Sequence, residues 1–298
     1  MPQVTFEEIE CKSALNRINV PSMPQLRWSL NPYRGCQHAC VYCFARGNHE
    51  FLGYDTGRDF NERIIVKTNL VPVLKRELRR SGWKREAVTI GTACDPYQQA
   101  ELKYGLTRGA LQAFATHANP CSIITKSPAI ERDLSILLEL SSVAECTVMF
   151  SIPTLREEIW RHIEPETPSP ASRLEALAKL SNAGVRCGVM LAPIIPGLTD
   201  DTENMEAVVR AARDNGASFV GDNVLHLKPG TKEWFMPFLR ETYPHLLPTY
   251  ERFYRGAYAP KGYSENVTAT VQRLRERMGM TPDQLPAREP VGQLQLAV

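Results

Sequence analysis

The chain has 298 residues, 35 Lys and Arg against 33 Asp and Glu, and a formal net charge of +2. This length suffices for one large core, and so small a net charge excludes a global field that would require a polyanionic partner, so any nucleic-acid binding must be local. The eight cysteines are too few for a disulfide scaffold, and only three of them crowd together, which indicates a metal or redox site.

The N-terminal segment carries acidic residues where a secretory signal would have a basic start and an apolar stretch. The most apolar run, 189–195, contains Pro193 and is much shorter than the roughly 20 residues that span a bilayer. We therefore expect a cytoplasmic protein without a membrane segment.

Short β-rich runs, each followed by a helical pattern, recur along the chain. They are 27–30, 87–91, 121–125, 146–151, 185–191 and 218–225. Helix starts are signalled at Ser127, Ser169 and 199–201, and Gly184 and Gly216 mark helix ends. This alternation predicts an α/β fold with a parallel sheet, and its spacing favours six βα units curled into a partial TIM-type (β/α)6 barrel over an open sheet.

The pattern divides the chain into three regions: an N-terminal extension (1–24), the partial barrel (25–231) and a helical C-terminal extension with a tail (232–298). Segment 232–258 is aromatic and helical in pattern but has no strand after it, so we expect it to cover one end of the barrel. The last ten or so residues are polar and Pro-rich, which predicts a mobile tail.

Three cysteines, Cys36, Cys40 and Cys43, directly follow the first strand, where barrel enzymes place their chemistry. Spacings of three and two residues let one loop hold three corners of an iron-sulfur cluster, and no fourth cysteine lies nearby in the sequence. One iron would then be open to a reactant. The alternative is a zinc site completed by His38 or His49.

The spacing Cys-x3-Cys-x2-Cys resembles the hallmark of the radical S-adenosylmethionine (SAM) superfamily. The segments NPYRGCQHACVYCFAR and GTACDPYQQAE are similar to the branch related to spore photoproduct lyase. The resemblance implies a 4Fe-4S cluster on the three cysteines, SAM on the open iron, and reductive cleavage of SAM to a 5'-deoxyadenosyl radical. It also implies a lyase-like reaction and an electron donor such as a flavodoxin or ferredoxin.

The same resemblance places Tyr42 beside the adenine of SAM. Arg34 and Arg46 flank the cluster, where cationic side chains would offset its negative charge and raise its potential. The alternative is that both are ordinary solvated arginines.

The loop 91–101 gathers polar side chains beyond the second strand, as suits the binding of SAM and substrate. We expect Thr92 and Asp95 to bind SAM in place of the Gly-Gly-Glu motif that many radical SAM enzymes carry here. Alternatively, Asp95 only organises a turn. Cys94 is the candidate catalytic thiol that returns a hydrogen atom to a product radical, although the donor of the lyases falls nearer to Thr92.

Lys126 and Ser151 end the third and fourth strands, at positions that match SAM contacts in the lyase-like branch. An ammonium suits the SAM carboxylate, and a hydroxyl suits the carboxylate or the ribose. The alternatives are a solvated rim lysine and a helix-capping serine.

A nucleic-acid lesion is the first substrate hypothesis, by analogy with the lyase, and a small molecule or a protein is the alternative within the class. A lyase on DNA would need a basic trough and a flipped-out lesion, which the near-neutral charge does not favour. Outside the class, the alternative is a zinc-bound, non-catalytic interaction protein.

Overall fold

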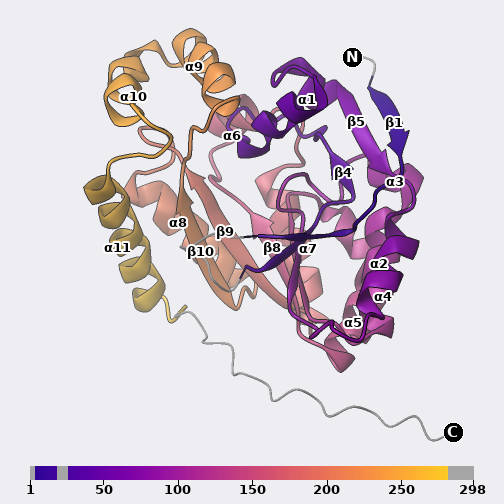
Figure 1. Cartoon of the computed structure of the whole chain (residues 1–298). Helices are drawn as coiled ribbons and strands as arrows, with labels where there is room; N and C mark the ends of the chain where they lie inside the picture. The colour runs from indigo at the N-terminus through magenta and orange to yellow at the C-terminus, as the bar shows by residue number, and fades with distance from the viewer. Residues whose placement is uncertain (1–3, 19–25, 281–298) are drawn as a thin grey trace, which may run out of the picture.

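A seven-stranded sheet forms the centre of the computed structural model, which describes residues 4–18 and 26–280 (Figure 1). In spatial order its strands are β10 (Phe219–Val224), β9 (Arg186–Ile194), β8 (Cys146–Ser151), β7 (Cys121–Thr125), β6 (Val88–Ile90), β3 (Trp28–Leu30) and β2 (Leu15–Arg17). All neighbours pair in parallel except β2, which runs antiparallel to β3. The predicted α/β class and its six strands are confirmed. Within the described part of the chain the sheet does not close on itself, because its edge strands β2 and β10 do not pair, and the curl into a partial barrel stays a prediction.

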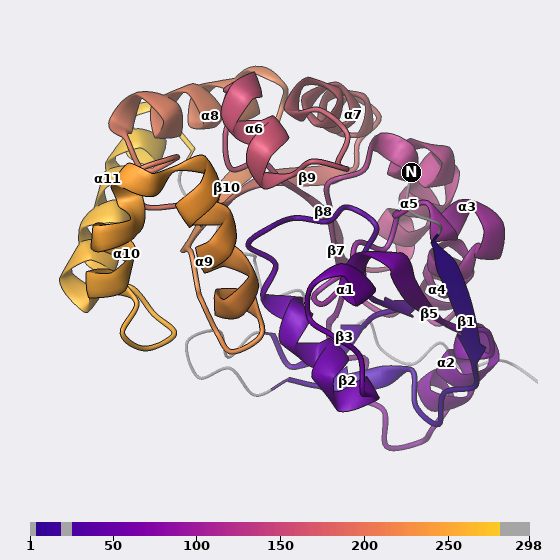
Figure 2. The same cartoon turned by 90° about the horizontal axis from the view of Figure 1, so that it is seen from above.

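Helices follow the outer side of this sheet (Figure 2). Those along the sheet are α4 (Leu106–Thr116), α5 (Leu134–Val143), α7 (Pro170–Asn182) and α8 (Thr202–Asp214). The predicted starts are confirmed, since Ser127, Ser169 and Asp201 each accept an amide hydrogen at the start of η2 (Pro128–Asp133), α7 and α8. The remaining helices before residue 164 are η1 (Phe44–Leu52), α1 (Arg58–Glu62), α2 (Leu70–Leu78), α3 (Ala100–Tyr104) and α6 (Glu157–Ile163).

Successive side chains along each strand point to opposite faces of the sheet, and the strand register aligns them in rows across the sheet. One fully buried apolar row faces the helices: Leu30, Ile90, Ile123, Val148 and Cys187. The neighbouring row on the opposite face is polar: Ser29, Thr89, Ser122, Thr147 and Arg186. The fully buried row therefore belongs to the core, while the other face mixes these polar side chains with the half-buried Ile124 and Met149.

A second, three-stranded sheet was not predicted. The strand β1 (Thr5–Ile9) pairs in parallel with β5 (Arg63–Lys67), and β5 pairs antiparallel with β4 (Tyr33–Arg34). The chain thus ties its N-terminal segment to the start of the cysteine loop. Residues 1–3 and 19–25, which the predicted N-terminal extension includes in large part, lie outside the described residues.

The C-terminal region is helical, as predicted. It contains α9 (Thr231–Thr242), η3 (Pro244–Leu246), α10 (Leu247–Phe253) and α11 (Lys261–Arg277). Helix α9 contacts η1, and α11 packs against α8 and β10. The predicted mobile tail falls within 281–298, outside the described residues. Among the helices that the structure describes, none combines the length and the apolar character needed to cross a membrane.

Candidate cluster and cofactor site

Two glycines set the course of the loops that carry the site. Gly35 has a φ of 82°, and a Cβ there would meet the carbonyl oxygens of Phe60 and Arg63 at 2.9 Å. Gly91, just after β6, has a φ of 89°, and its Cβ would lie 2.4 Å from the carbonyl oxygen of Ile124. Because only glycine tolerates both this φ and this proximity, both loops can pass tightly against neighbouring backbone.

The cysteine loop is a series of tight turns. The amides of Ala39, Cys43 and Arg46 donate to the carbonyls of Cys36, Cys40 and Cys43 respectively, each at 3.3 Å. A turn therefore begins at each cysteine. The side chains of Cys36 and Cys40 are buried, and Cys43 is half-buried. The structure thus brings the three predicted ligands together on one folded loop.

The buried thiols fit a metal-sulfur group. Burial raises the pKa of Cys36 well above its ordinary value, and Asp95, Cys40 and Cys43 raise it further. Burial also raises the pKa of Cys40 to about 12, against the opposing charge of Lys126. Metal-bound cysteines are thiolates, and iron would supply the positive charge that makes thiolates stable here.

One backbone amide supports the same assignment. The N–H of Asp95 donates to Cys36 Sγ at 3.5 Å. Hydrogen bonds to the sulfur ligands are among the features that set the potentials of iron-sulfur clusters. The loop after β6 therefore contacts the cysteine loop at a ligand atom.

A zinc site receives no support from the geometry. In residues 4–18 and 26–280, no three His, Cys, Asp or Glu side chains converge on one ion position. His49 Nε2 lies 3.2 Å from the carbonyl oxygen of Arg63, and His38 Nδ1 lies 3.3 Å from Asp95 Oδ2. A structural zinc needs its donors around a single point, whereas a cluster spreads its thiolates over several iron atoms.

Three of the predicted SAM-binding residues surround one buried ion pair. Glu164 and Arg173 have fully buried side chains, and Arg173 Nη2 lies 2.6 Å from Glu164 Oε2. The Tyr42 hydroxyl donates to Glu164 Oε1, and Lys126 Nζ lies 3.9 Å from the same oxygen. Arg173 Nη1 donates to the carbonyl of Ser151 at 2.8 Å. Tyr42, Lys126 and Ser151 are therefore brought together at the carboxyl ends of β7 and β8.

Lys126, Arg173 and Glu164 together carry one excess positive charge, since the two cations share a single carboxylate; Asp95 is a further anion whose charge acts on Lys126. Burial alone would raise the pKa of Glu164, but Arg173 and Lys126 outweigh it and lower the pKa. Burial would lower the pKa of Lys126, but Cys40 and Glu164 outweigh it and raise the pKa. The Lys126 side chain is only 17% exposed, so it is not a solvated rim lysine.

Ser151 is also not a helix cap. It ends β8, and its hydroxyl donates to the carbonyl of Ala192 at 2.8 Å. The hydroxyl oxygen keeps its capacity to accept a hydrogen bond. Contact with SAM remains a prediction for this residue.

Asp95 is fully engaged in protein contacts. Its Oδ1 accepts hydrogen bonds from the Tyr97 amide and the Thr125 hydroxyl, both at 2.8 Å, and its Oδ2 accepts from the Lys126 amide at 2.7 Å. Burial would raise the pKa of Asp95, but His38 and these donors outweigh it and hold the pKa at about 2. These contacts favour the turn-organising role, and a direct role in SAM binding remains a prediction.

Asn31 organises the start of the same loop. Its Nδ2 donates to Thr92 Oγ1 at 3.0 Å, and its Oδ1 accepts from the Ala93 amide at 2.8 Å. The buried thiol of Cys94 donates to the same Oδ1 at 3.9 Å. Burial raises the pKa of Cys94 to about 12, so the thiol keeps its proton at neutral pH.

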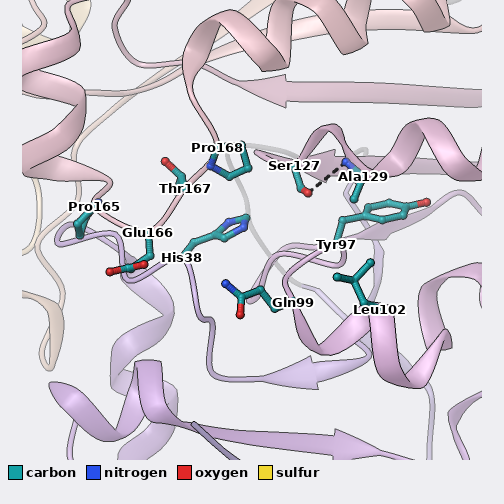
Figure 3. A pocket seen from close by; sticks show the side chains of 10 residues that line it. All are labelled: His38, Tyr97, Gln99, Leu102, Ser127, Ala129, Pro165, Glu166, Thr167 and Pro168. Atoms are coloured by element: carbon teal, nitrogen blue, oxygen red, sulfur yellow. Dashed lines mark hydrogen bonds between the residues drawn. The ribbon is translucent and has the colours of Figure 1, made fainter. Parts of the chain in front are cut away.

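A cavity of about 340 Å³ lies next to the cysteine loop (Figure 3). Its lining residues are His38, Tyr97, Gln99, Leu102, Ser127, Ala129, Pro165, Glu166, Thr167 and Pro168. Of the cysteine loop only His38 lines it, and none of the predicted cluster or SAM residues does. The cavity therefore borders the candidate site, since His38 lies 3.3 Å from Asp95 and Thr167 accepts a hydrogen bond from Arg173.

Residues 30–209 match the model of the radical SAM superfamily. An uncharacterized protein of Mycobacterium bovis is 40% identical over 286 residues, which cover 95% of this chain and 84% of that protein. An uncharacterized protein of Methanocaldococcus jannaschii is 28% identical over 256 residues, which cover 86% of this chain and 90% of that protein.

Solved structures show the same fold. Spore photoproduct lyase complexed with dinucleoside spore photoproduct matches with a TM-score of 0.69 and 16% identity, covering 92% of this chain and 79% of that chain. At such low identity the likeness concerns the fold alone.

The chain belongs to the radical SAM superfamily. Members of this superfamily are enzymes that use a 4Fe-4S cluster and SAM and require an electron donor, so a 4Fe-4S cluster and SAM are the cofactors of this chain.

Sequence reasoning missed Glu164, Arg173 and Asn31. Glu164 is 122 residues away from Tyr42, and Asn31 is 61 residues away from Thr92. Nothing in the segment HIEPETPSP separates Glu164 from an ordinary acidic residue after a helix. Only the tertiary structure identifies these three as organisers of the site.

Proposed function

We propose that Cys36, Cys40 and Cys43 hold the 4Fe-4S cluster and that Tyr42, Lys126 and Ser151, with Thr92 and Asp95, form the SAM site. The observation that carries this proposal is the convergence of three segments on the Glu164–Arg173 pair beside the cysteine loop. When bound, the cofactors supply a 5'-deoxyadenosyl radical, which abstracts a hydrogen atom from the substrate.

The residues of the chain then orient SAM and shield the site from water. The Lys126 ammonium pairs with the carboxylate of SAM, because it is the excess cation of its group and is largely removed from water. Glu164 holds the Tyr42 hydroxyl, so the Tyr42 ring keeps a fixed position for the adenine. Asp95 and Asn31 act through the loop after β6, which they tie to β7 and to the segment after β3.

Cys94 is the candidate donor of a hydrogen atom to the product radical. A donor must carry its proton, and the raised pKa of about 12 keeps the S–H bond intact at neutral pH. Its burial beside Asn31 also shields the thiol from water.

The fold organises this chemistry as a partial (β/α)6 barrel over 25–231, with 1–24 and 232–298 as extensions. The proposed SAM-binding residues Thr92, Asp95, Lys126 and Ser151 end a parallel strand or lie in the loop directly after one, which is where barrel enzymes carry their active sites. We further propose a cytoplasmic enzyme reduced by a flavodoxin or ferredoxin, since a reducing compartment keeps free thiols reduced.

The first substrate candidate is a nucleic-acid lesion in a lyase-like reaction. It is supported by the fold that the chain shares with a lyase solved with a dinucleoside photoproduct. The net charge of +2 favours the second candidate, a small molecule or a protein, because it offers no general attraction for a polyanion.

Anaerobic reconstitution with iron and sulfide, followed by reduction and incubation with SAM, tests the proposal. We expect a brown protein with about four irons per chain that releases 5'-deoxyadenosine, measured by chromatography. A colourless protein with one tightly bound zinc and no SAM cleavage would contradict it. Adding ultraviolet-irradiated DNA tests the lyase candidate, which fails if photoproducts persist and 5'-deoxyadenosine does not increase.

A further inference from the structure

Arg46 is a fully buried arginine inside the fold of the cysteine loop. Its guanidinium contacts two aromatic rings, 5.0 Å from the centre of Phe60 and 4.7 Å from that of Trp234 on α9. Its nitrogens donate to the carbonyls of Ala39 (3.3 Å), Cys40 (3.0 and 3.3 Å), Thr56 (3.0 Å) and Gly57 (2.8 Å) and to Asn61 Oδ1 (3.1 Å). All of these acceptors are neutral.

No carboxylate in the described ranges forms an ion pair with Arg46, whereas the buried Arg173 has Glu164. An isolated charge in a protein interior is strongly unfavourable unless an opposite charge accompanies it. Carbonyl dipoles and aromatic faces stabilise the guanidinium only in part. The charge of Asp55 attracts the guanidinium but forms no ion pair with it, so the arrangement lacks a directly paired anion.

The cysteine loop can supply that anion. Arg46 donates to the backbone of Ala39 and Cys40, and its own amide bonds to the carbonyl of Cys43, so it is folded against two of the three predicted ligands. The ligands become thiolates when they bind iron. Inside a buried site, the attraction between a fixed guanidinium and such a group is only weakly screened.

We propose that Arg46 is a positioning residue that acts as the built-in counter-charge of the cluster, raising its midpoint potential and so easing its one-electron reduction. This inference rests on the assignment of the cluster to Cys36, Cys40 and Cys43. The competing explanation is a purely structural clamp, in which the hydrogen bonds matter and the charge does not.

Three variants distinguish an effect of the Arg46 charge from a purely structural effect of its hydrogen bonds. Arg46→Lys keeps the charge and loses the planar donor fork. Arg46→Gln loses the charge. Asn61→Asp keeps the contact to Arg46 and gives the guanidinium an ionic partner. It therefore neutralises the charge while the hydrogen bonds of Arg46 stay in place. This variant also tests the charge if Arg46→Gln does not fold. The matched control is Arg34→Gln, because Arg34 also flanks Cys36 but is exposed and screened.

The readouts are iron and sulfide per chain and the midpoint potential of the loaded cluster, from a redox titration followed by electron paramagnetic resonance. We expect Arg46→Gln and Asn61→Asp to make one-electron reduction at least tenfold less favourable, which equals about 59 mV toward negative potential. We expect the equilibrium constant of one-electron reduction in Arg46→Lys and Arg34→Gln to stay within threefold of that of the unmodified protein.

Unchanged midpoint potentials in Asn61→Asp, and in Arg46→Gln if that variant binds a cluster, would overturn the proposal. The purely structural role of the Arg46 hydrogen bonds would then be the explanation. A potential in Arg46→Lys as low as in Arg46→Gln would also overturn it, because the charge is retained in the lysine variant. A failure of the unmodified protein to load iron and sulfide would contradict the cluster assignment itself, so the two failures are distinguishable.

Discussion

On one side of the cysteine loop Arg46 is buried among neutral acceptors, whereas on the other side Lys126 and Arg173 share the carboxylate of Glu164. The second group is assembled from the protein's own charges. The first has no ion pair with a carboxylate of the described residues, although the charge of Asp55 acts on it. We therefore expect the group of Lys126, Arg173 and Glu164 (the strand side) to be in place before cofactor binding, and the surroundings of Arg46 (the loop side) to depend on the proposed cluster.

The largest expected effect comes from Cys40, which links the two sides. Its carbonyl accepts from Arg46, and its thiol is among the groups that raise the pKa of Lys126. Cys40→Ala should abolish cluster loading, because two thiolates cannot hold the cluster in place of three. Iron and sulfide analysis after anaerobic reconstitution measures the loss.

Cys187→Ala is the matched control, since Cys187 is equally buried but lies in β9. It should load as well as the unmodified protein. Normal loading of Cys40→Ala, or loss of loading in Cys187→Ala, would break the link between the loop and the cluster.

Glu164→Gln should strongly destabilise the strand side. Removing the carboxylate leaves the buried guanidinium of Arg173 and the ammonium of Lys126 without their anion, which costs about 3 to 5 kcal/mol. Urea denaturation of the cofactor-free protein measures the change in the free energy of unfolding.

The control for this change is Glu157→Gln, where an equally close ion pair with Arg161 is about two thirds exposed, at 68% and 67%. An exposed pair contributes little, so this variant should change stability by at most about 0.5 kcal/mol. Equal effects of the two variants would mean that Glu164 is not the anion on which its neighbours depend.

The strands and the cysteine loop could be predicted because their signals are local. The six parallel strands follow from apolar runs between capping residues, and the ligand spacing lies within eight consecutive residues, 36–43. Burial could not be predicted in the same way: Arg34 and Arg46 look alike in the sequence, yet one is exposed and the other fully buried.

The second sheet and the Glu164 group illustrate what the sequence leaves open. β4 has only two residues, and its partner β5 lies some thirty residues further along the chain. Tyr42 and Glu164 meet where the cysteine loop contacts the end of α6, since the Val41 amide donates to the Ile163 carbonyl at 3.0 Å. Pairings over such distances depend on the completed fold and not on local periodicity.

Gly91→Ala tests whether the loop after β6 needs its close approach to β7. A methyl group there combines an unfavourable positive φ with contact at 2.4 Å to the carbonyl of Ile124. We expect a loss of about 2 to 4 kcal/mol in stability and weaker SAM binding. Gly105→Ala is the control, since its φ is also positive, at 60°, but nothing lies within 4 Å. It should lose only about 1 to 2 kcal/mol, and similar losses in both variants would deny the role of the close approach.

Lys126→Ala tests whether the excess positive charge of the strand side binds SAM, and it has the smallest expected effect of these variants. The structure pairs Glu164 with Arg173 at 2.6 Å, so removing Lys126, at 3.9 Å, leaves that ion pair intact and should affect stability little. SAM binding should weaken about tenfold, the worth of one charged hydrogen bond, as measured by equilibrium dialysis with the reconstituted protein. Lys103→Ala, an exposed lysine, should bind SAM normally. If Lys126→Ala binds SAM unchanged but loses stability like Glu164→Gln, then Lys126 belongs to the buried ion pair, and the strand side has no charge to offer the cofactor.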